Sequence, residues 1–185
     1  MDYLLYVLLG IGLAAACGFR VFVPLLAISI AALAGQLELA PDFSWLGSWP
    51  ALIVFGVATV FEIVAYYVPW LDHVLDIGAT PAAVVAGIVV TASVVTGMNP
   101  VLRWTLAAIA GGGIAAAVQL ATVALRRAST YATAGLAHPL ATTVETGGSV
   151  GMSVLSLLVP AVAGVLALVL IILAARRLGR HRAKA

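Results

Sequence analysis

Charged side chains are scarce in this chain, and the scarcity indicates its class. The 185 residues include nine Lys or Arg and seven Asp or Glu, so charged residues make up 9% and hydrophobic residues 64%. Soluble domains average roughly 25% charged residues, which argues against an ordinary soluble domain. Several stretches reach the roughly 20 apolar residues that cross a bilayer. We predict an all-α, polytopic integral membrane protein surrounded by lipid.

Cysteine and catalytic motifs are equally sparse. The single cysteine, Cys17, leaves no partner for a disulfide or a thiolate metal site. No histidine lies near it in sequence and no H-E-x-x-H pattern occurs, so we expect no enzyme, no metal and no cofactor. The triple glycine at 111–113 is followed by no Lys-Ser or Lys-Thr, which argues against a phosphate-binding loop.

Six apolar stretches predict six spans, at about 3–34, 50–68, 79–98, 101–125, 130–149 and 152–174. Gly18 and Pro24 predict a bend or break in the first. Asp76 or Thr80 is expected to cap the third, with Pro81 in its first turn. The fifth contains His138, a following proline and late glycines, which is typical of a broken or re-entrant helix.

The basic residues predict the orientation. Arg126 and Arg127 lie between two apolar stretches, and a basic tail follows the last one, at 176–185. The positive-inside rule places both in the cytoplasm, and the tail is expected to be an anchor that binds no nucleic acid. Six crossings would then leave both termini cytoplasmic. Tyr66 is expected to be an interface anchor at the end of the second span.

Three pairs of similar stretches suggest an internal duplication. They are 10–17 with 111–118, 58–62 ("ATVFE") with 141–145 ("ATTVE"), and 81–87 with 160–164. Each proposed copy holds three spans, and an odd number inverts the second copy relative to the first. We therefore predict two inverted-topology repeats, 1–98 and 99–175, before the tail at 176–185. Transporters built this way bind substrate near the midplane, often at interrupted helices.

Two longer motifs carry a family resemblance. The stretches "GLAAACGFRVFVPLL" and "FEIVAYYVPWLDHVLDIGATPAAVVAG", with the size and spacing of the chain, resemble a bacterial integral membrane protein family catalogued as a domain of unknown function. The resemblance covers most of the chain. It implies no activity, so it assigns no functional residue here.

Three charges fall inside the predicted spans: Arg20, Glu62 and Glu145. Inserting a charged side chain at the centre of a membrane span costs about 2.5–3.5 kcal/mol, so each of the three needs a partner. If Arg20 pairs with Glu62, Glu145 has no obvious cation and could carry a proton or bind a cation. If Arg20 pairs with Glu145 instead, Glu62 is the glutamate without an obvious cation. A third interpretation is structural, in which all three charges only fix the register of the helices.

Small and polar residues complete the predicted site. His138, seven residues before Glu145 on the same predicted helix face, could extend a proton path, and the remaining site candidates are Thr59, Thr142 and Gln119. Helix breaks or hinges are expected at Gly18, Pro24, Gly111, Gly112, Gly113, Gly147 and Gly148. The carboxylate–histidine cluster at 72–76 is expected to be a solvated turn with a helix cap.

These features favour two functions. The first is a small transporter or channel for an ion or small polar solute, with proton coupling through Glu62 and Glu145. The second is a non-transporting assembly or partner protein whose buried charges are structural. For the second, or for a homo-oligomer, a helix–helix seam is expected at Gly10, Ala14 and Gly18, or at Gly147 and Gly151.

Overall fold

The computed structural model describes residues 2–66, 69–133 and 138–182, with the side chains at 2, 69–77, 127–133, 138–139, 174–175 and 177–182 outside the description. These residues form helices and connections without strands. In order they are α1 (Asp2–Cys17), α2 (Phe22–Leu33), the 3₁₀ helix η1 (Pro41–Gly47), α3 (Trp49–Ala65), α4 (Pro69–Val94), α5 (Pro100–Leu106), the π-helix η2 (Ala107–Gly112), α6 (Gly113–Thr133), α7 (His138–Leu158) and α8 (Pro160–Arg182).

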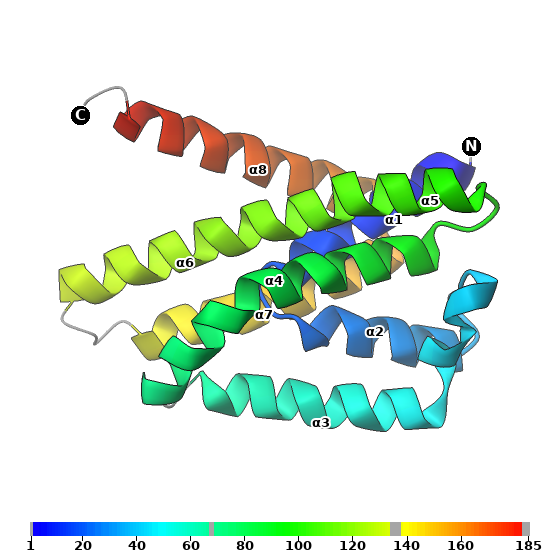
Figure 1. Cartoon of the computed structure of the whole chain (residues 1–185), viewed down its shortest axis with the longest axis horizontal. Helices are drawn as coiled ribbons and strands as arrows, with labels where there is room; N and C mark the ends of the chain where they lie inside the picture. The colour runs from blue at the N-terminus through cyan, green and yellow to red at the C-terminus, as the bar shows by residue number, and fades with distance from the viewer. Residues whose placement is uncertain (1, 67–68, 134–137, 183–185) are drawn as a thin grey trace.

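The first segment is a helical hairpin, not one bent span. The helix α1 runs into the bundle, breaks at residues 18–21, and α2 returns toward the end where α1 began (Figure 1). Contacts along α2 agree, since Val21 is bonded to Glu62 near the end of α3 and Ala32 adjoins Gly47 before its start. A break is present at Gly18 as expected, since α1 ends at Cys17, but the chain reverses there and residues 3–34 do not form one bent span.

The remaining helices alternate in direction along the long axis of the bundle (Figure 1). The chain passes down α3, back along α4, down the continuous rod of α5, η2 and α6, back along α7, and down α8. As a result α1 begins and α8 ends at opposite ends of the bundle. The hairpin adds one reversal of the chain to the six predicted segments, which accounts for this separation. The expected cytoplasmic location of both termini stays a prediction.

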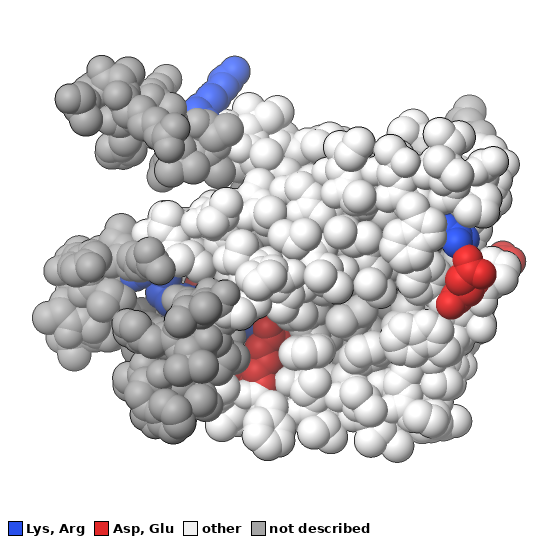
Figure 2. All heavy atoms as spheres, viewed as in Figure 1, with Lys and Arg blue, Asp and Glu red and all other residues white. Residues whose placement is uncertain are grey.

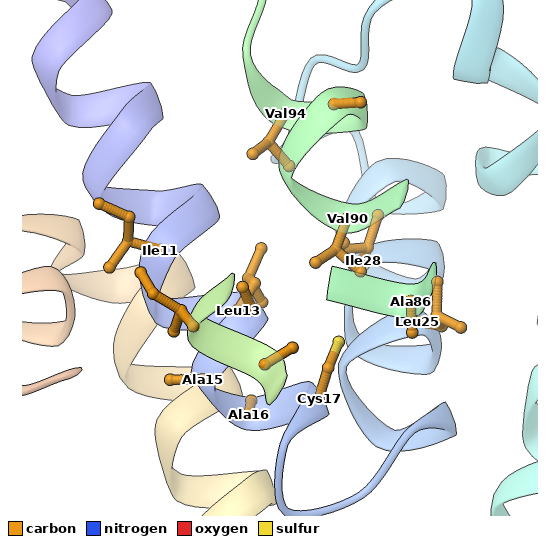
Figure 3. Close-up of a cluster of buried hydrophobic side chains, with 14 of the residues drawn as sticks. Ile11, Leu13, Ala15, Ala16, Cys17, Leu25, Ile28, Ala86, Val90 and Val94 are labelled. Atoms are coloured by element: carbon orange, nitrogen blue, oxygen red, sulfur yellow. The ribbon is translucent and has the colours of Figure 1, made fainter. Parts of the chain in front are cut away.

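The core forms where α1 packs between α2, α4 and the second half of the chain. Figure 3 shows Leu13 and Cys17 of α1 among Ile28 of α2 and Val90 of α4, all buried. Alanines fill much of α1, and short side chains let neighbouring helices approach closely. The helix α1 therefore forms the centre of the molecule.

Glycines set the closest helix crossing, between α4 and η2. A Cβ at Gly111 would lie 2.5 Å from the Gly87 carbonyl oxygen, and one at Gly87 would lie 2.6 Å from that of Gly111. The Thr91 hydroxyl donates to the carbonyl oxygens of Gly87, at 2.8 Å, and Gly10, at 3.2 Å, which ties α4 to α1. Only glycine fits at positions 87 and 111, where the two backbones touch.

Several expected helix breaks are wrong. Gly111 and Gly112 lie in η2, where they pack closely against α4, and the exposed Gly113 begins α6, so the helical rod continues through the triple glycine. Gly147 and Gly148 lie inside α7, which is neither broken nor re-entrant between His138 and Leu158. Pro24 lies in the first turn of α2, where a missing N–H costs little.

Two helix boundaries also differ. The helix α4 begins at Pro69, so Pro81 is interior to it and the expected cap at Asp76 or Thr80 is wrong. The fifth and sixth segments meet at Val159, not between 149 and 152. Asn99 caps the next helix, because its side-chain oxygen accepts from the Val101 N–H at 2.9 Å and α5 begins at Pro100.

Helix length and apolarity single out one membrane-span candidate among the described residues, the 27-residue stretch Pro100–Arg126. A bent pair, Pro41–Gly47 with Trp49–Ala65, passes the same test only when its two parts are joined. Four other apolar helices are shorter than the 18 residues required of a span, at Tyr3–Cys17, Phe22–Leu33, Gly78–Val94 and Pro160–Leu173.

Candidate functional site

The hairpin turn carries a fully buried arginine into the bundle. Arg20 is 1% exposed and follows the last turn of α1. Its Nε donates to the Thr146 hydroxyl at 3.2 Å, and its Nη2 donates to the Thr142 carbonyl oxygen at 3.3 Å. Gly18 makes this turn possible, since a Cβ there would lie 2.5 Å from Val118 of α6. The turn is therefore wedged between α6 and α7.

Glu145 on α7 lies between two guanidinium groups. Arg126 of α6 holds it side-on, with Nε donating to Oε1 at 3.1 Å and Nη2 donating to Oε2. Arg20 Nη2 lies 3.7 Å from Oε2, which is an ion-pair distance but a poor hydrogen bond. Side-on Arg–carboxylate pairs are among the strongest hydrogen-bonded ion pairs. Of the two pairings left open by the sequence, the structure has Arg20 beside Glu145.

Glu62 on α3 is bonded to backbone instead. Its two carboxylate oxygens accept from the N–H groups of Val21, at 2.7 Å, and Phe22, at 3.0 Å. These N–H groups open α2, which has no side-chain cap of its own. A carboxylate at a helix N-terminus satisfies orphan donors and faces the positive end of the helix dipole. Glu62 thus takes no cation among the described residues.

Tyr66 is enclosed between the two arginines. The guanidinium carbons of Arg20 and Arg126 lie 4.0 Å and 4.6 Å from the centre of its ring, within cation–π range. The residue is 3% exposed, so the expectation of an interface anchor is wrong. It follows Glu62 by one helical turn, which brings its ring to the same cluster.

The remaining predicted residues divide into neighbours of the cluster and others. Thr142 and Thr59 are buried and each lies three residues before a glutamate, and the hydroxyl oxygens of both lack hydrogen-bond partners in the structure. Gln119 is buried on α6 and shares no described hydrogen bond or ion pair with the cluster. The side chain of His138 and those at 72–76 lie outside the described residues.

A sequence comparison decides the family. Residues 7–180 match the family described as Domain of unknown function (DUF4126). The chain belongs to DUF4126. No curated protein and no solved structure matches it. The predicted membership of a domain family of unknown function is thus confirmed, and the family description assigns no role to the cluster of this DUF4126 chain.

Of the four buried charges in the cluster of this DUF4126 chain, only Arg126 was not predicted from the sequence. Arg126 was placed in a cytoplasmic connection, yet it is 5% exposed inside α6. Its spacing carries the signal, since Gln119, Thr122 and Arg126 recur on one helix face. The formal charges of Arg20, Arg126, Glu62 and Glu145 sum to zero, so the cluster is balanced without an added ion.

A G-x-S-x-G stretch lies in α7 of the DUF4126 chain. Residues 147–151, "GGSVG", have the G-x-S-x-G spacing of serine hydrolases, which could be weighed against the expectation of no enzyme. That motif places its serine on a sharp turn between a strand and a helix. Here Ser149 is buried in the middle of α7, and its hydroxyl donates to the Ala16 carbonyl oxygen at 3.0 Å. The geometry is that of a helix-packing residue.

Proposed function

We propose that this protein is a small integral membrane transporter or channel for an ion or small polar solute. One observation carries the proposal, which is the α1–α2 hairpin that ends inside the bundle with Arg20 at its tip. Irregular backbone at membrane depth is tolerated where protein or a polar cavity covers it. Broken helices that bring backbone and charged groups together are the usual construction of transporter binding sites.

The surface supports a lipid environment. Large apolar side chains are exposed on the outer faces of α3, α5, α7 and α8, among them Phe61, Val101, Val144 and Leu158. Soluble monomers rarely expose apolar patches of more than a few hundred Å². Figure 2 shows a face that is mostly uncharged, with acidic and basic atoms confined to a few places. A bilayer around the bundle accounts for this pattern.

The charges at the two ends support an orientation. Arg176 belongs to the last third of α8, and the positive-inside rule assigns the end of the bundle where α8 finishes to the cytoplasm (Figure 1). The opposite end contains η1, whose Asp42 pairs with Arg103 of α5. In this orientation the start of α1 lies on the outer side of a bacterial inner membrane, opposite the basic tail.

The geometry favours a structural role for the carboxylates of Glu62 and Glu145. Glu145 is shared by two arginines and Glu62 caps α2, so both are used in holding the hairpin. Proton coupling through either glutamate thus has less support than solute binding at Arg20. The inverted three-span repeat stays a prediction: α3 and α7 run in opposite directions, as do α4 and α8, whereas α1 and α6 run in the same direction.

Flux through reconstituted vesicles tests the proposal. Wild type, Arg20→Gln and the exposed-site control Glu38→Gln would be compared for uptake of labelled Na⁺, K⁺, Cl⁻ and formate. We expect flux of at least one solute in wild type and in the control. Loss of one charged hydrogen bond, about 1.5 kcal/mol, should slow it about tenfold or more in Arg20→Gln. Flux that is equal in all three proteins would refute a site at Arg20.

A second function, a non-transporting assembly or partner protein, is favoured by one surface. The seam residues Gly10 and Gly18 are in close contact inside the molecule, but Gly147 and Gly151 lie on an exposed face of α7 with open space around them. A small-x-x-x-small pair in an apolar face suits helix–helix association, including a homo-oligomer. Wild type that is folded, shows no flux and copurifies as one size of oligomer would support this function instead.

A further inference from the structure

Arg20 is the member of the cluster whose hydrogen-bonding capacity is least used. A guanidinium has five N–H donors and no acceptor. Nε and Nη2 bond to Thr146 and to the Thr142 carbonyl oxygen, whereas Nη1 has no hydrogen-bond partner although the residue is 1% exposed. A buried donor is nearly always bonded in native proteins. The two N–H groups of Nη1 therefore require an acceptor.

The neighbouring acidic groups do not supply that acceptor. Glu145 is the nearest carboxylate, but its closest contact to Arg20 is 3.7 Å from Nη2, and Arg126 binds both of its oxygens. Glu62 is bonded through both oxygens to the first N–H groups of α2. Each glutamate is thus directed to another group, and Arg20 has the charge that is least closely neutralised.

A second buried donor without a partner lies on Thr142, the residue whose carbonyl oxygen accepts from Arg20. The Thr142 hydroxyl is fully buried and has no hydrogen-bond partner, while the carbonyl oxygen of the same residue is bonded to Arg20 Nη2. Its neighbour one turn away, Thr146, already donates its hydroxyl hydrogen to that carbonyl oxygen at 2.9 Å. The turn after α1 and the start of α7 therefore each contribute one unsatisfied donor, on two residues that are joined by the bond from Arg20 Nη2 to the Thr142 carbonyl oxygen.

We propose that Arg20 Nη1 and the Thr142 hydroxyl bind a small anion, a halide or a small carboxylate. This inference rests on the proposed function and specifies its solute class. A guanidinium cannot accept a hydrogen bond and stays protonated in proteins, so neither a metal cation nor a transferred proton fits at Nη1. The four formal charges of the cluster already sum to zero, so the anion is drawn by the local geometry, in which Arg20 lies 3.7 Å from its nearest carboxylate oxygen while Arg126 is bonded to both oxygens of Glu145.

Thermal unfolding of the full chain in detergent tests the ligand class directly. Sodium chloride and sodium formate would be titrated against sodium gluconate at constant ionic strength, with tryptophan fluorescence as the readout. A ligand of the folded state raises the melting temperature with a saturable dose dependence. We expect such a rise with chloride or formate and none with gluconate, which is too large for a site closed by α6 and α7.

Matched variants locate the response. Thr142→Val removes the unpartnered hydroxyl and keeps size and backbone, so it should melt like wild type without salt and need about tenfold more anion. Arg20→Lys keeps the positive charge but loses the planar pair of N–H groups, and it should lose the response. Thr105→Val is the control, since Thr105 is exposed on α5 and bonds its own helix at Val101. It should respond as wild type does.

The outcomes separate this inference from the proposed function. No stabilisation of wild type by chloride or formate overturns the anion site, even if vesicles show Arg20-dependent flux of another solute. A response that is unchanged in Thr142→Val and Arg20→Lys also overturns it, because the anion then binds elsewhere. A saturable response that both variants lose supports the site, even if no flux is measured and the transport proposal fails.

Discussion

Replacement of Glu62 by glutamine measures how much the hairpin depends on one carboxylate. Glu62 accepts two backbone N–H bonds at the start of α2, at 2.7 and 3.0 Å, and is 7% exposed. Glutamine keeps one acceptor oxygen and places an NH₂ group against the other N–H. One charge-assisted bond is lost and a buried donor is left without an acceptor, which together cost about 2–4 kcal/mol.

The assay is thermal unfolding of the purified protein. For a chain of this size, 1 kcal/mol corresponds to about 2–4 °C, so we expect Glu62→Gln to melt about 5–15 °C below wild type. Glu38→Gln is the matched control, because Glu38 lies exposed in the connection before η1, and it should melt with wild type. A shift below about 2 °C for Glu62→Gln would refute the capping role. Normal stability with abolished flux would instead favour the proton-carrier interpretation.

Four further substitutions test other parts of the fold, each by the same measurement. Glu145→Gln leaves Arg20 and Arg126 without their shared carboxylate and should cost about 3–5 kcal/mol, the range for breaking a buried ion pair; a cost near zero would contradict the pairing. Gly111→Ala should cost about 1–3 kcal/mol by overpacking against Gly87. Gly113→Ala, where a Cβ meets open space, should be neutral or stabilise by up to about 1 kcal/mol, and equal effects would refute the close crossing. Tyr66→Leu removes the ring between the arginines and should cost about 1–2 kcal/mol; no change would mean the stacking contributes nothing.

The helical class and the three buried charges were predictable because composition and isolated charges are local signals. Arg20, Glu62 and Glu145 stand out in apolar stretches, and all three are buried. The reversal at Gly18 was harder, since a break in an apolar stretch looks the same whether the chain continues or turns back. Only contacts distant in sequence, such as Val21 with Glu62, decide between the two.

The pairing of the charges could not be predicted for a related reason. Arg126 stands beside Arg127 in the sequence, where a pair of basic residues is typical of a cytoplasmic connection. In the structure α6 continues past Arg126 to Thr133, so this arginine faces α7 from within a helix. One misplaced helix end thus hid the strongest partner of Glu145 and made that glutamate look unpaired.

The two "A-T-x-x-E" stretches show how similar sequence can serve different contacts. In both, a buried threonine precedes a buried glutamate by three residues, on helices that run in opposite directions. Yet Glu62 binds the backbone of α2, whereas Glu145 binds two arginines. If the halves arose by inversion, helix direction pairs α2, α3 and α4 with α6, α7 and α8 and leaves α1 outside the repeat. The resemblance between 10–17 and 111–118 then reflects alanine-rich packing, because α1 and α6 run the same way and an inverted pair cannot.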